Sequence, residues 1–313
     1  MITSSDVRAA AARLAGHVRV TPMIEADRGA FPPASRVWLK LEHLQHTGSF
    51  KVRGAFNRIL SAAEQDMLPD MGVVAASGGN AGLAVAYAAA CYGLPARVYV
   101  PATAPPVKVA RLREYGATVV QEGDRYADAY EAAAKHAARA GALFCHAYDQ
   151  PEICAGQGTL GLELLDQADG QVDTILVAVG GGGLMAGVAT VSEGRARVAG
   201  AEPASIPTLR AALAAGRPAD VAVGGIAADS LGATRLGDIA YAVAARTNVR
   251  SVLVSDADIN TARKYLWDKY RVAAEHGGAT ALAALLTRAY QPAEGERIAV
   301  VVCGANTDPT TLA

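Results

Sequence analysis

The sequence predicts an α/β protein made of two three-layer lobes, each with a mostly parallel sheet covered by helices. Short runs of β-branched and other apolar residues alternate with alanine-rich stretches along the chain, a pattern typical of parallel strands buried between helices. Two of these runs, Val73–Ala76 and Thr174–Val179, each lead through a glycine-rich turn into a helical stretch. Two such junctions indicate two lobes with a ligand cleft between them.

The expected strands share an apolar, β-branched composition and are bounded by polar or glycine-rich residues. They are Val37–Leu41, Gly72–Ala76, Ala96–Val100, Ala117–Gln121, Thr174–Val179, Arg197–Ala201 and Arg297–Val302. Examples of the helices expected between them are Ala81–Tyr92, Pro106–Glu114 and Ala127–Ala140. No long linker interrupts the pattern, so we place the lobe boundaries near residues 50 and 145.

Composition excludes several functional classes. Lys and Arg total 29, Asp and Glu total 30, and the net charge of −1 provides no general attraction to nucleic acid or to a membrane surface. The aromatic content of 5% also argues against base stacking. The four cysteines form neither a CxxC pair nor a zinc pattern, which favours a reducing cytoplasm.

Neither end of the chain suggests a targeting or regulatory segment. The N-terminus lacks the basic and apolar regions of a signal peptide. The apolar run from Thr174 to Val191 is interrupted by four glycines, so we expect a strand, a loop and a helix there, and no membrane span. Ten residues follow Cys303, and we therefore expect no C-terminal regulatory domain.

The tetraglycine at 180–183 predicts a phosphate-binding loop. Successive glycines let backbone N–H groups converge on one point, and the following helix adds the positive end of its dipole. A second interpretation is open, because Gly181, Gly183 and Ala186 match a relaxed dinucleotide fingerprint. Glu202, at the end of the next expected strand, has about the spacing of a ribose-binding acid.

Lys51 lies where a reactive amine is expected. Either Thr47 or Ser49 can cap a helix that begins at this point. A lysine in the first turn of a helix faces the positive end of the dipole, which disfavours its protonation. A neutral lysine amine can attack an aldehyde and form a Schiff base. The dinucleotide interpretation leaves this residue unexplained.

Four separated motifs together resemble a known family. They are Thr47–Lys51 with Arg53–Ala55, Ser77–Gly82, Val179–Leu184 and Val302–Asn306. In this order they resemble the fold-type II pyridoxal-phosphate (PLP) enzymes, in the branch of serine/threonine dehydratases and serine racemases. The resemblance implies a tryptophan synthase β-subunit-like fold. We then expect residues 1–51 and 145–313 to form a large cofactor-binding domain, and residues 52–144 a small mobile domain that closes over the substrate.

The resemblance implies a role for each matching residue. Lys51 would hold PLP as a Schiff base and later take the α-proton of the substrate. Phe50 would pack beside the cofactor ring, and Asn80 would hydrogen-bond the ring hydroxyl. The phosphate would be bound by backbone N–H groups of Gly180, Gly181, Gly182, Gly183 and Leu184. The substrate carboxylate would be held by Ser77, Gly78, Asn80 and Ala81.

Two further residues are assigned to the neighbourhood of the ring by the resemblance. Cys303 would face the pyridine nitrogen, and Glu275 matches an acid that family members place near the ring. A thiol does not force a proton onto that nitrogen, so the ring becomes a weaker electron sink than an aspartate would make it. A weaker sink suits elimination, in which the leaving group departs soon after the α-proton.

The chain departs from family patterns at two positions. Family racemases carry a proton-donating serine where this chain has Gly78, so dehydration is favoured over racemisation. Some members bind a divalent cation through a glutamate and an aspartate six residues beyond it. Glu202 fits the first position, but Thr208 occupies the second. Because hard cations prefer carboxylates, we expect no metal.

The expected activity is that of a PLP-dependent ammonia-lyase. It would remove water from L-serine or L-threonine and produce a 2-oxo acid and ammonia. Open alternatives are dehydration of another β-hydroxy amino acid such as 3-hydroxyaspartate, a racemase side activity, a β-replacement lyase of the cysteine-synthase type and, from another class, an NAD-dependent dehydrogenase. The expected partner is a small amino acid, with neither nucleic acid nor membrane. The family implies a homodimer, and the cysteine pattern favours the cytoplasm.

Overall fold

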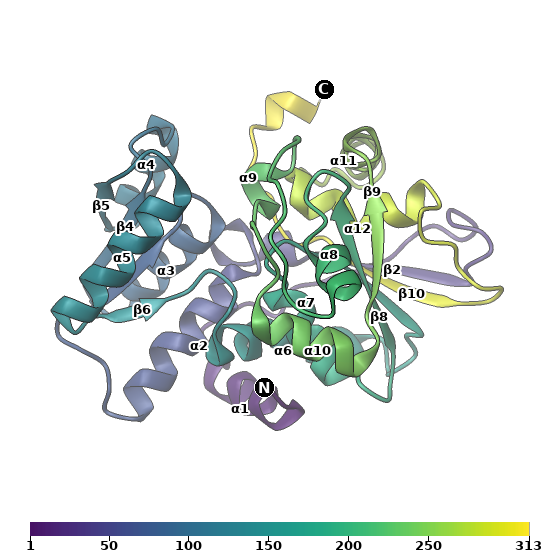
Figure 1. Ribbon diagram of the computed structural model, residues 1–313. Helices are drawn as coiled ribbons and strands as arrows, with labels where there is room; N and C mark the ends of the chain where they lie inside the picture. The colour runs from purple at the N-terminus through teal and green to yellow at the C-terminus, as the bar shows by residue number, and fades with distance from the viewer. Residues whose placement is uncertain (313) are drawn as a thin grey trace.

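The computed structural model describes residues 1–312 and has two α/β lobes that lie side by side (Figure 1). The larger lobe is built on a six-stranded sheet in the order β1-β2-β10-β7-β8-β9, and the smaller on a four-stranded sheet in the order β5-β4-β3-β6. The pairing of β1 with β2 is antiparallel, and the other strand pairings are parallel. The predicted α/β fold with mostly parallel sheets is therefore confirmed.

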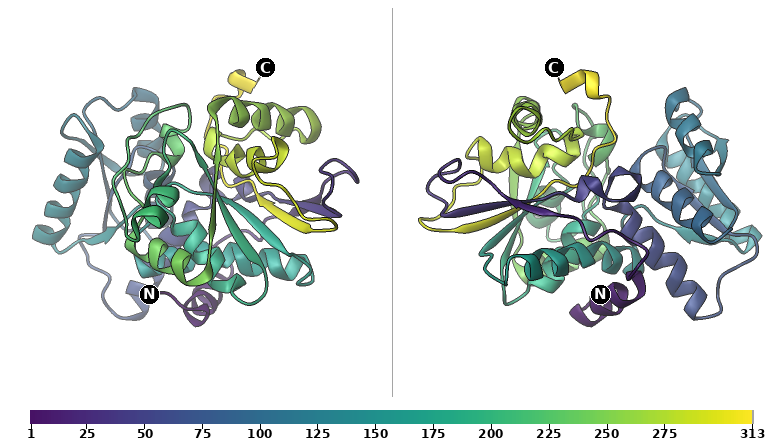
Figure 2. Two further views of the ribbon diagram at one scale, coloured as in Figure 1. Left: turned by 45° about the vertical axis from the view of Figure 1, so that its right-hand side comes forward. Right: turned by 180° about the vertical axis from the view of Figure 1, so that it is seen from behind.

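The six-stranded sheet has helices on both faces, which makes the three layers of the larger lobe (Figure 2). Helices α6 and α7 pack together on one face, and α11 and α12 pack together on the other. The strands are β1 (Met23–Glu25), β2 (Arg36–Lys40), β7 (Thr174–Ala178), β8 (Arg197–Pro203), β9 (Arg250–Val254) and β10 (Arg297–Val301). The helices are α1 (Ser4–Leu14), α6 (Pro151–Gln167), α7 (Gly183–Ser192), α8 (Thr208–Ala215), α9 (Ala228–Leu231), α10 (Asp238–Thr247), α11 (Asp256–Tyr270) and α12 (His276–Leu286).

The smaller lobe shows how strand alternation builds a three-layer sandwich. Val73 and Ala75 of β3 point into a core shared with α3 and α4, whereas Val74 and Ala76 point into a core shared with α5. The strands are β3 (Val73–Ala76), β4 (Ala96–Val100), β5 (Thr118–Gln121) and β6 (Leu143–Cys145). The helices are α3 (Asn80–Cys91), α4 (Pro106–Glu114) and α5 (Tyr126–Ala140).

The remaining elements connect the lobes and the chain ends. They are η1 (Glu42–Leu44), η2 (His46–Gly48), α2 (Lys51–Glu64) and η3 (Pro309–Leu312). Helix α2 packs against α3 of the smaller lobe and against α6 of the larger lobe. Among the described residues, none of the helices combines the length and apolar character that crossing a bilayer requires.

All seven predicted strands are present, but the sequence analysis missed β1, β6 and β9. β1 is short and forms the antiparallel edge of its sheet, and β6 is equally short. β9 lies at the other edge and begins with Arg250 and Ser251, so its apolar run is only three residues long. The division into a large domain and a small mobile domain stays a prediction.

A group of buried charges anchors α2 to the larger lobe. Arg53 is completely buried, and its guanidinium donates to Glu42 Oε1 at 2.5 Å and to Glu163 Oε1 at 2.6 Å. Lys40 Nζ, also buried, lies 2.9 Å from Glu163 Oε2 and donates to the backbone oxygen of Thr21. The positive charges of Arg53 and Lys40 are therefore balanced by the negative charges of Glu42 and Glu163. Although burial alone disfavours its charge, Glu42 and Glu163 raise the pKa of Arg53 above its ordinary value.

We predict that Glu42→Gln lowers the free energy of unfolding by about 3–5 kcal/mol, because it leaves Arg53 buried with only one carboxylate. Urea denaturation followed by circular dichroism measures this loss. The matched control is Glu25→Gln, which breaks the exposed Arg36–Glu25 pair and should change stability much less. Equal losses in the two variants would contradict the assigned role of the buried network.

Candidate active site

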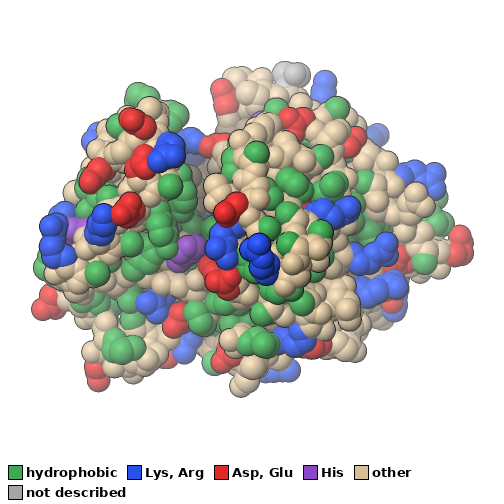
Figure 3. Space-filling model, viewed as in Figure 1, with side chains coloured by type: hydrophobic (Ala, Val, Ile, Leu, Met, Phe, Trp, Pro, Cys, Tyr) green, Lys and Arg blue, Asp and Glu red, His purple; other side chains and the backbone are tan. Residues whose placement is uncertain are grey.

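The candidate active site is a cavity of about 450 Å³ between the two lobes. Its walls come from the carboxyl ends of β3 and β7 and from the first turn of α2, where ligands are expected in open α/β sheets. The hollow between the lobes is visible on the molecular surface (Figure 3). The lining includes these predicted residues: Phe50, Lys51, Ser77, Gly78, Asn80, Ala81, Gly180, Gly181, Gly182, Gly183, Leu184 and Cys303.

Lys51 is the first residue of α2, as predicted, but the predicted cap is wrong. The residue before the helix is Phe50, and neither Thr47 nor Ser49 caps it. Thr47 has a φ of 59°, and Ser49 is extended and forms a β-bridge with Gly304. With this backbone conformation, neither hydroxyl caps the first turn of α2. Both are buried without a hydrogen-bond partner among the described residues.

The Lys51 amine faces the cavity in a setting that favours its neutral form. Nζ donates to the backbone oxygen of Ala147 at 2.7 Å and lies 5.1 Å from the Phe50 ring centroid. Burial lowers the pKa of Lys51 to about 8, and the nearby carboxyl group of Glu275 only partly opposes this. Burial is therefore the main cause of the lowered pKa, whereas the sequence suggested the helix dipole. The amine is suited to nucleophilic attack.

The tetraglycine loop joins β7 to the N-terminus of α7 and leaves no room for side chains. Gly182 has a φ of 87°, a conformation that favours glycine. A Cβ added to Gly181 would overlap the Tyr148 ring, and one added to Gly183 would lie 2.6 Å from the backbone oxygen of Tyr148. Within the described residues, the backbone N–H groups of Gly181, Gly182 and Gly183 have no acceptor. This arrangement can bind an anion.

Asn80 is held by two partners from the end of the chain. Its Nδ2 donates to Glu275 Oε1 at 2.7 Å, and its Oδ1 accepts from Asn306 Nδ2 at 2.6 Å. Asn306 Nδ2 also donates to the backbone oxygen of Thr47. Burial raises the pKa of Glu275 to about 7, although the hydrogen bond from Asn80 opposes this. Glu275 thus lies directly behind the cavity-lining residue Asn80 and changes its protonation state near neutral pH.

Cys303 follows β10 and reaches the cavity from the larger lobe. It is a free, buried thiol, and its Sγ lies 3.6 Å from the backbone oxygen of Gly277. Burial raises its pKa above the ordinary value, and Glu275 adds to this. The thiol therefore stays protonated at neutral pH, so Cys303 contributes no charge to the site.

Glu202 is a structural carboxylate and lies outside the cavity. Its two oxygens accept from the N–H of Leu209 at 2.7 Å and of Arg210 at 2.8 Å at the start of α8, and also from Ser251 Oγ. The side chain is fully buried, and burial raises its pKa. Because it is fully buried and does not line the cavity, it is not placed to bind a ribose as the dinucleotide interpretation requires. The described residues contain no cluster of His, Cys, Asp and Glu arranged for a metal.

Several cavity residues escaped the sequence analysis. Tyr148 packs against Gly181, and the backbone of Ala147 accepts from Lys51. Lys108 and Asp229 form an ion pair, and both line the cavity. Each comes from a loop or helix without a recognisable motif, so only the tertiary structure brings them to Lys51.

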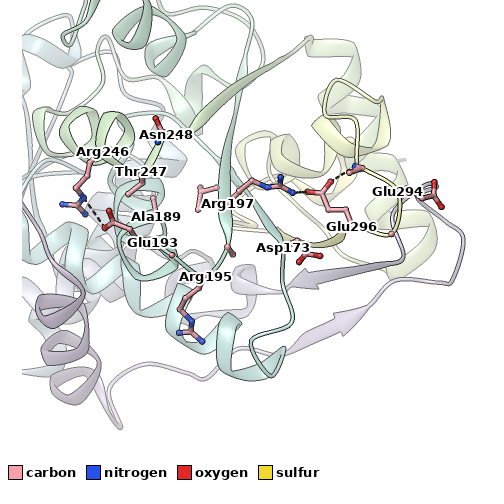
Figure 4. Close-up of a pocket in the computed structure, with 15 residues that line it drawn as sticks. Asp173, Ala189, Glu193, Arg195, Arg197, Arg246, Thr247, Asn248, Glu294 and Glu296 are labelled. Atoms are coloured by element: carbon pink, nitrogen blue, oxygen red, sulfur yellow. Dashed lines mark hydrogen bonds and ion pairs between the residues drawn. The ribbon is translucent and has the colours of Figure 1, made fainter.

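A second hollow, of about 660 Å³, lies at the amino-terminal ends of strands β7, β8 and β10, away from the candidate active site (Figure 4). Four of its charged residues form two ion pairs: Arg246 Nε lies 3.3 Å from Glu193, and Arg197 donates to Glu296 at 2.8 Å. It is next to the start of β8, the end of a parallel strand away from usual ligand sites. None of the predicted site residues lines it, so it is not the candidate active site.

Comparison with known proteins agrees with this geometry. Residues 14–304 match the family model described as "Pyridoxal-phosphate dependent enzyme". An L-threonine ammonia-lyase of Thermotoga maritima is 35% identical over 98% of this chain and 76% of its own length. A phenylserine dehydratase of Ralstonia pickettii is 36% identical over 96% of this chain and 92% of its own length. The structure of maize serine racemase superposes with a TM-score of 0.91 at 32% identity, covering 99% and 95% of the two chains.

We predict that the Lys51 amine of the cofactor-free protein is acetylated by acetic anhydride with a pH midpoint of about 8, because burial lowers its pKa to about 8. Mass spectrometry of the peptide that contains Lys51 measures the extent of labelling at each pH. The same peptide in urea-unfolded protein is the control, with a midpoint near the ordinary lysine value of about 10.4. Identical midpoints in folded and unfolded protein would contradict the prediction.

Proposed function

Because the chain belongs to the pyridoxal-phosphate dependent enzyme family, we propose that it is an ammonia-lyase that removes water from a β-hydroxy amino acid and produces a 2-oxo acid and ammonia. The observation that carries the proposal is that one cavity brings together the low-pKa amine of Lys51, the glycine cradle at 180–183 and the Ser77–Ala81 loop. The names of the similar proteins, threonine ammonia-lyase and phenylserine dehydratase, support the same reaction class.

The residues of the cavity fit PLP. The cofactor carries an aldehyde and a phosphate, and the cavity offers an amine and a set of N–H groups that have no acceptor in the described part of the chain. The glycine loop has no space for a Cβ, so an anion can approach its backbone closely. When bound, PLP supplies an aldehyde that joins to an amino group and a conjugated ring that stabilises negative charge at the α-carbon.

We propose the following roles for the chain's own groups. Lys51 holds the cofactor and, once free and neutral, takes the α-proton. The glycines at 180–183 and the N-terminus of α7 bind the phosphate. Ser77 and the backbone N–H groups of the Ser77–Ala81 loop hold the substrate carboxylate near the N-terminus of α3, so that the α-proton faces Lys51. Asn80 supports the ring hydroxyl, with its orientation set by Glu275 and Asn306.

The uncharged thiol of Cys303 favours elimination in this proposal. Cys303 would lie beside the pyridine nitrogen of bound PLP, and its protonated thiol would supply no counter-charge there, so the ring would stabilise negative charge at the α-carbon less than it would with an aspartate. Loss of the β-hydroxyl then competes well with reprotonation of the α-carbon. Gly78 has no side chain that could deliver a proton to the opposite face, which also favours dehydration over racemisation.

The substrate, the assembly and the location are part of the same proposal. L-Serine and L-threonine are the proposed substrates, with phenylserine as a further candidate because of the named relative. A homodimer in the cytoplasm follows from the family resemblance and from cysteines that are free among the described residues.

We predict that Lys51→Ala abolishes formation of 2-oxo acid from every β-hydroxy amino acid, because it removes both the cofactor anchor and the proton acceptor. A coupled 2-oxo acid assay over L- and D-serine, L- and D-threonine and phenylserine measures this. The matched control is Lys264→Ala, at an exposed lysine of α11, which should keep full activity. Unchanged turnover by Lys51→Ala would refute the proposed role.

We also predict that Gly181→Ala weakens PLP binding by about tenfold or more, equivalent to ~1.4 kcal/mol, because the new Cβ overlaps the Tyr148 ring and displaces the cradle. Titration of the cofactor-free protein with PLP, followed by absorbance, measures the affinity. The control is Gly224→Ala, since a Cβ at Gly224 meets no atom within 4 Å. Equal affinities of the two variants would show that the loop does not bind the phosphate.

A further inference from the structure

A salt bridge crosses the mouth of the cavity and joins the two lobes. Lys108 lies on α4 of the smaller lobe, and Asp229 lies on α9 of the larger lobe. Figure 1 places these two helices on facing sides of the space between the lobes. The side chains are 31% and 60% exposed, so the pair forms part of the rim of the cavity. The interaction spans 121 residues of sequence.

The pair lies beside the loop proposed to hold the substrate carboxylate. A Cβ at Gly78 would be 4.0 Å from Cδ of Lys108, and a Cβ at Gly79 would be 3.7 Å from the backbone oxygen of Asp229. The two residues therefore approach the Ser77–Ala81 loop from opposite lobes. A substrate bound by this loop has Lys108 and Asp229 as near neighbours.

The charges that line the cavity determine whether it can bind a second substrate carboxylate. Among the described lining residues, the charged side chains are Lys51, Lys108 and Asp229. Lys51 is assigned to the cofactor, which leaves Lys108 as the cation that a second substrate carboxylate could use. Asp229 already neutralises it. A substrate with a negatively charged β-substituent would have to displace Asp229 from Lys108, and it would then face the unpaired carboxylate of Asp229.

We propose that the Lys108–Asp229 pair determines selectivity at the β-position: Asp229 occupies Lys108, so the enzyme accepts uncharged β-substituents and rejects a β-carboxylate such as that of 3-hydroxyaspartate. Without Asp229, Lys108 is free to bind a second carboxylate by a charge-assisted hydrogen bond. The pair thus discriminates against a β-carboxylate, because Lys108 attracts that group and Asp229 repels it. This inference rests on the proposed function, because it assumes that an amino acid binds at the Ser77–Ala81 loop.

The test compares kcat/KM for 3-hydroxyaspartate and L-serine in the holoenzyme. Asp229→Asn should raise the ratio of these values by about tenfold, the size expected for one hydrogen bond to a charged group. Adding Lys108→Met to Asp229→Asn should return the ratio to that of the unmodified enzyme or below it. The matched control is Asp238→Asn, which breaks an exposed pair with Arg235 outside the cavity lining and should leave the ratio unchanged.

A binding measurement separates this inference from the proposed function. Calorimetry of the holoenzyme with L-aspartate and L-alanine requires no turnover. Asp229→Asn should improve the affinity for L-aspartate relative to L-alanine, and the double variant should lose that gain. If no β-hydroxy amino acid is turned over but this shift occurs, the proposed function is wrong and the selectivity role stands. An unchanged preference in Asp229→Asn, or an unmodified enzyme that already prefers L-aspartate, overturns the selectivity role.

Discussion

The position of the reactive amine depends on the buried ion network around Arg53. This residue lies two positions after Lys51 on α2, and its guanidinium is enclosed by Glu42 and Glu163 from the larger lobe. A buried charge without its partners is costly, so the first turn of α2 has few alternative positions. Lys51 therefore enters the cavity from a fixed backbone, even though α2 also packs against the smaller lobe. Functional groups on rigid elements keep their geometry better than groups on loops.

The anion site uses backbone groups where a charged side chain could have served. Glycines at 180–183 expose N–H groups at the start of α7, and the ring and backbone of Tyr148 fill the volume where side chains would project. Such a cradle adds no titratable group to the site. The low pKa of Lys51 then follows from burial, since no nearby cation is needed to lower it.

Two groups of the site, Cys303 on the cavity wall and Glu275 behind Asn80, stay neutral or titrate near pH 7. The thiol of Cys303 is protonated because burial disfavours its thiolate. Glu275 has a pKa of about 7 and holds the amide of Asn80, which Asn306 orients from the other side. Proton uptake by Glu275 would thus change the hydrogen bond that Asn80 Nδ2 donates to it. Buried networks of this kind orient a polar side chain strongly when every member has a partner.

The sequence alone was enough to predict the α/β class, seven of the strands and four of the segments that line the cavity. Apolar alternation, the two glycine junctions and Lys51 are local signals, because they follow from the hydrogen-bonding and steric needs of neighbouring residues. Weak local signals produced the misses: β1, β6 and β9 lie at sheet edges or are very short. The helix cap was predicted wrongly because a positive φ at Thr47 cannot be read from its flanking residues.

Only the tertiary structure decided which distant residues surround Lys51 and how they are charged. Asn80 meets Glu275 across 195 residues, and Lys108 meets Asp229 across 121. Glu202 has the spacing of a ligand-binding acid in the sequence, yet the fold uses it to cap α8. Pairings of this kind arise when parallel strands bring remote loops to one edge, and pKa values depend on the resulting burial. Neither the pairings nor the pKa values are encoded in any single stretch of the chain.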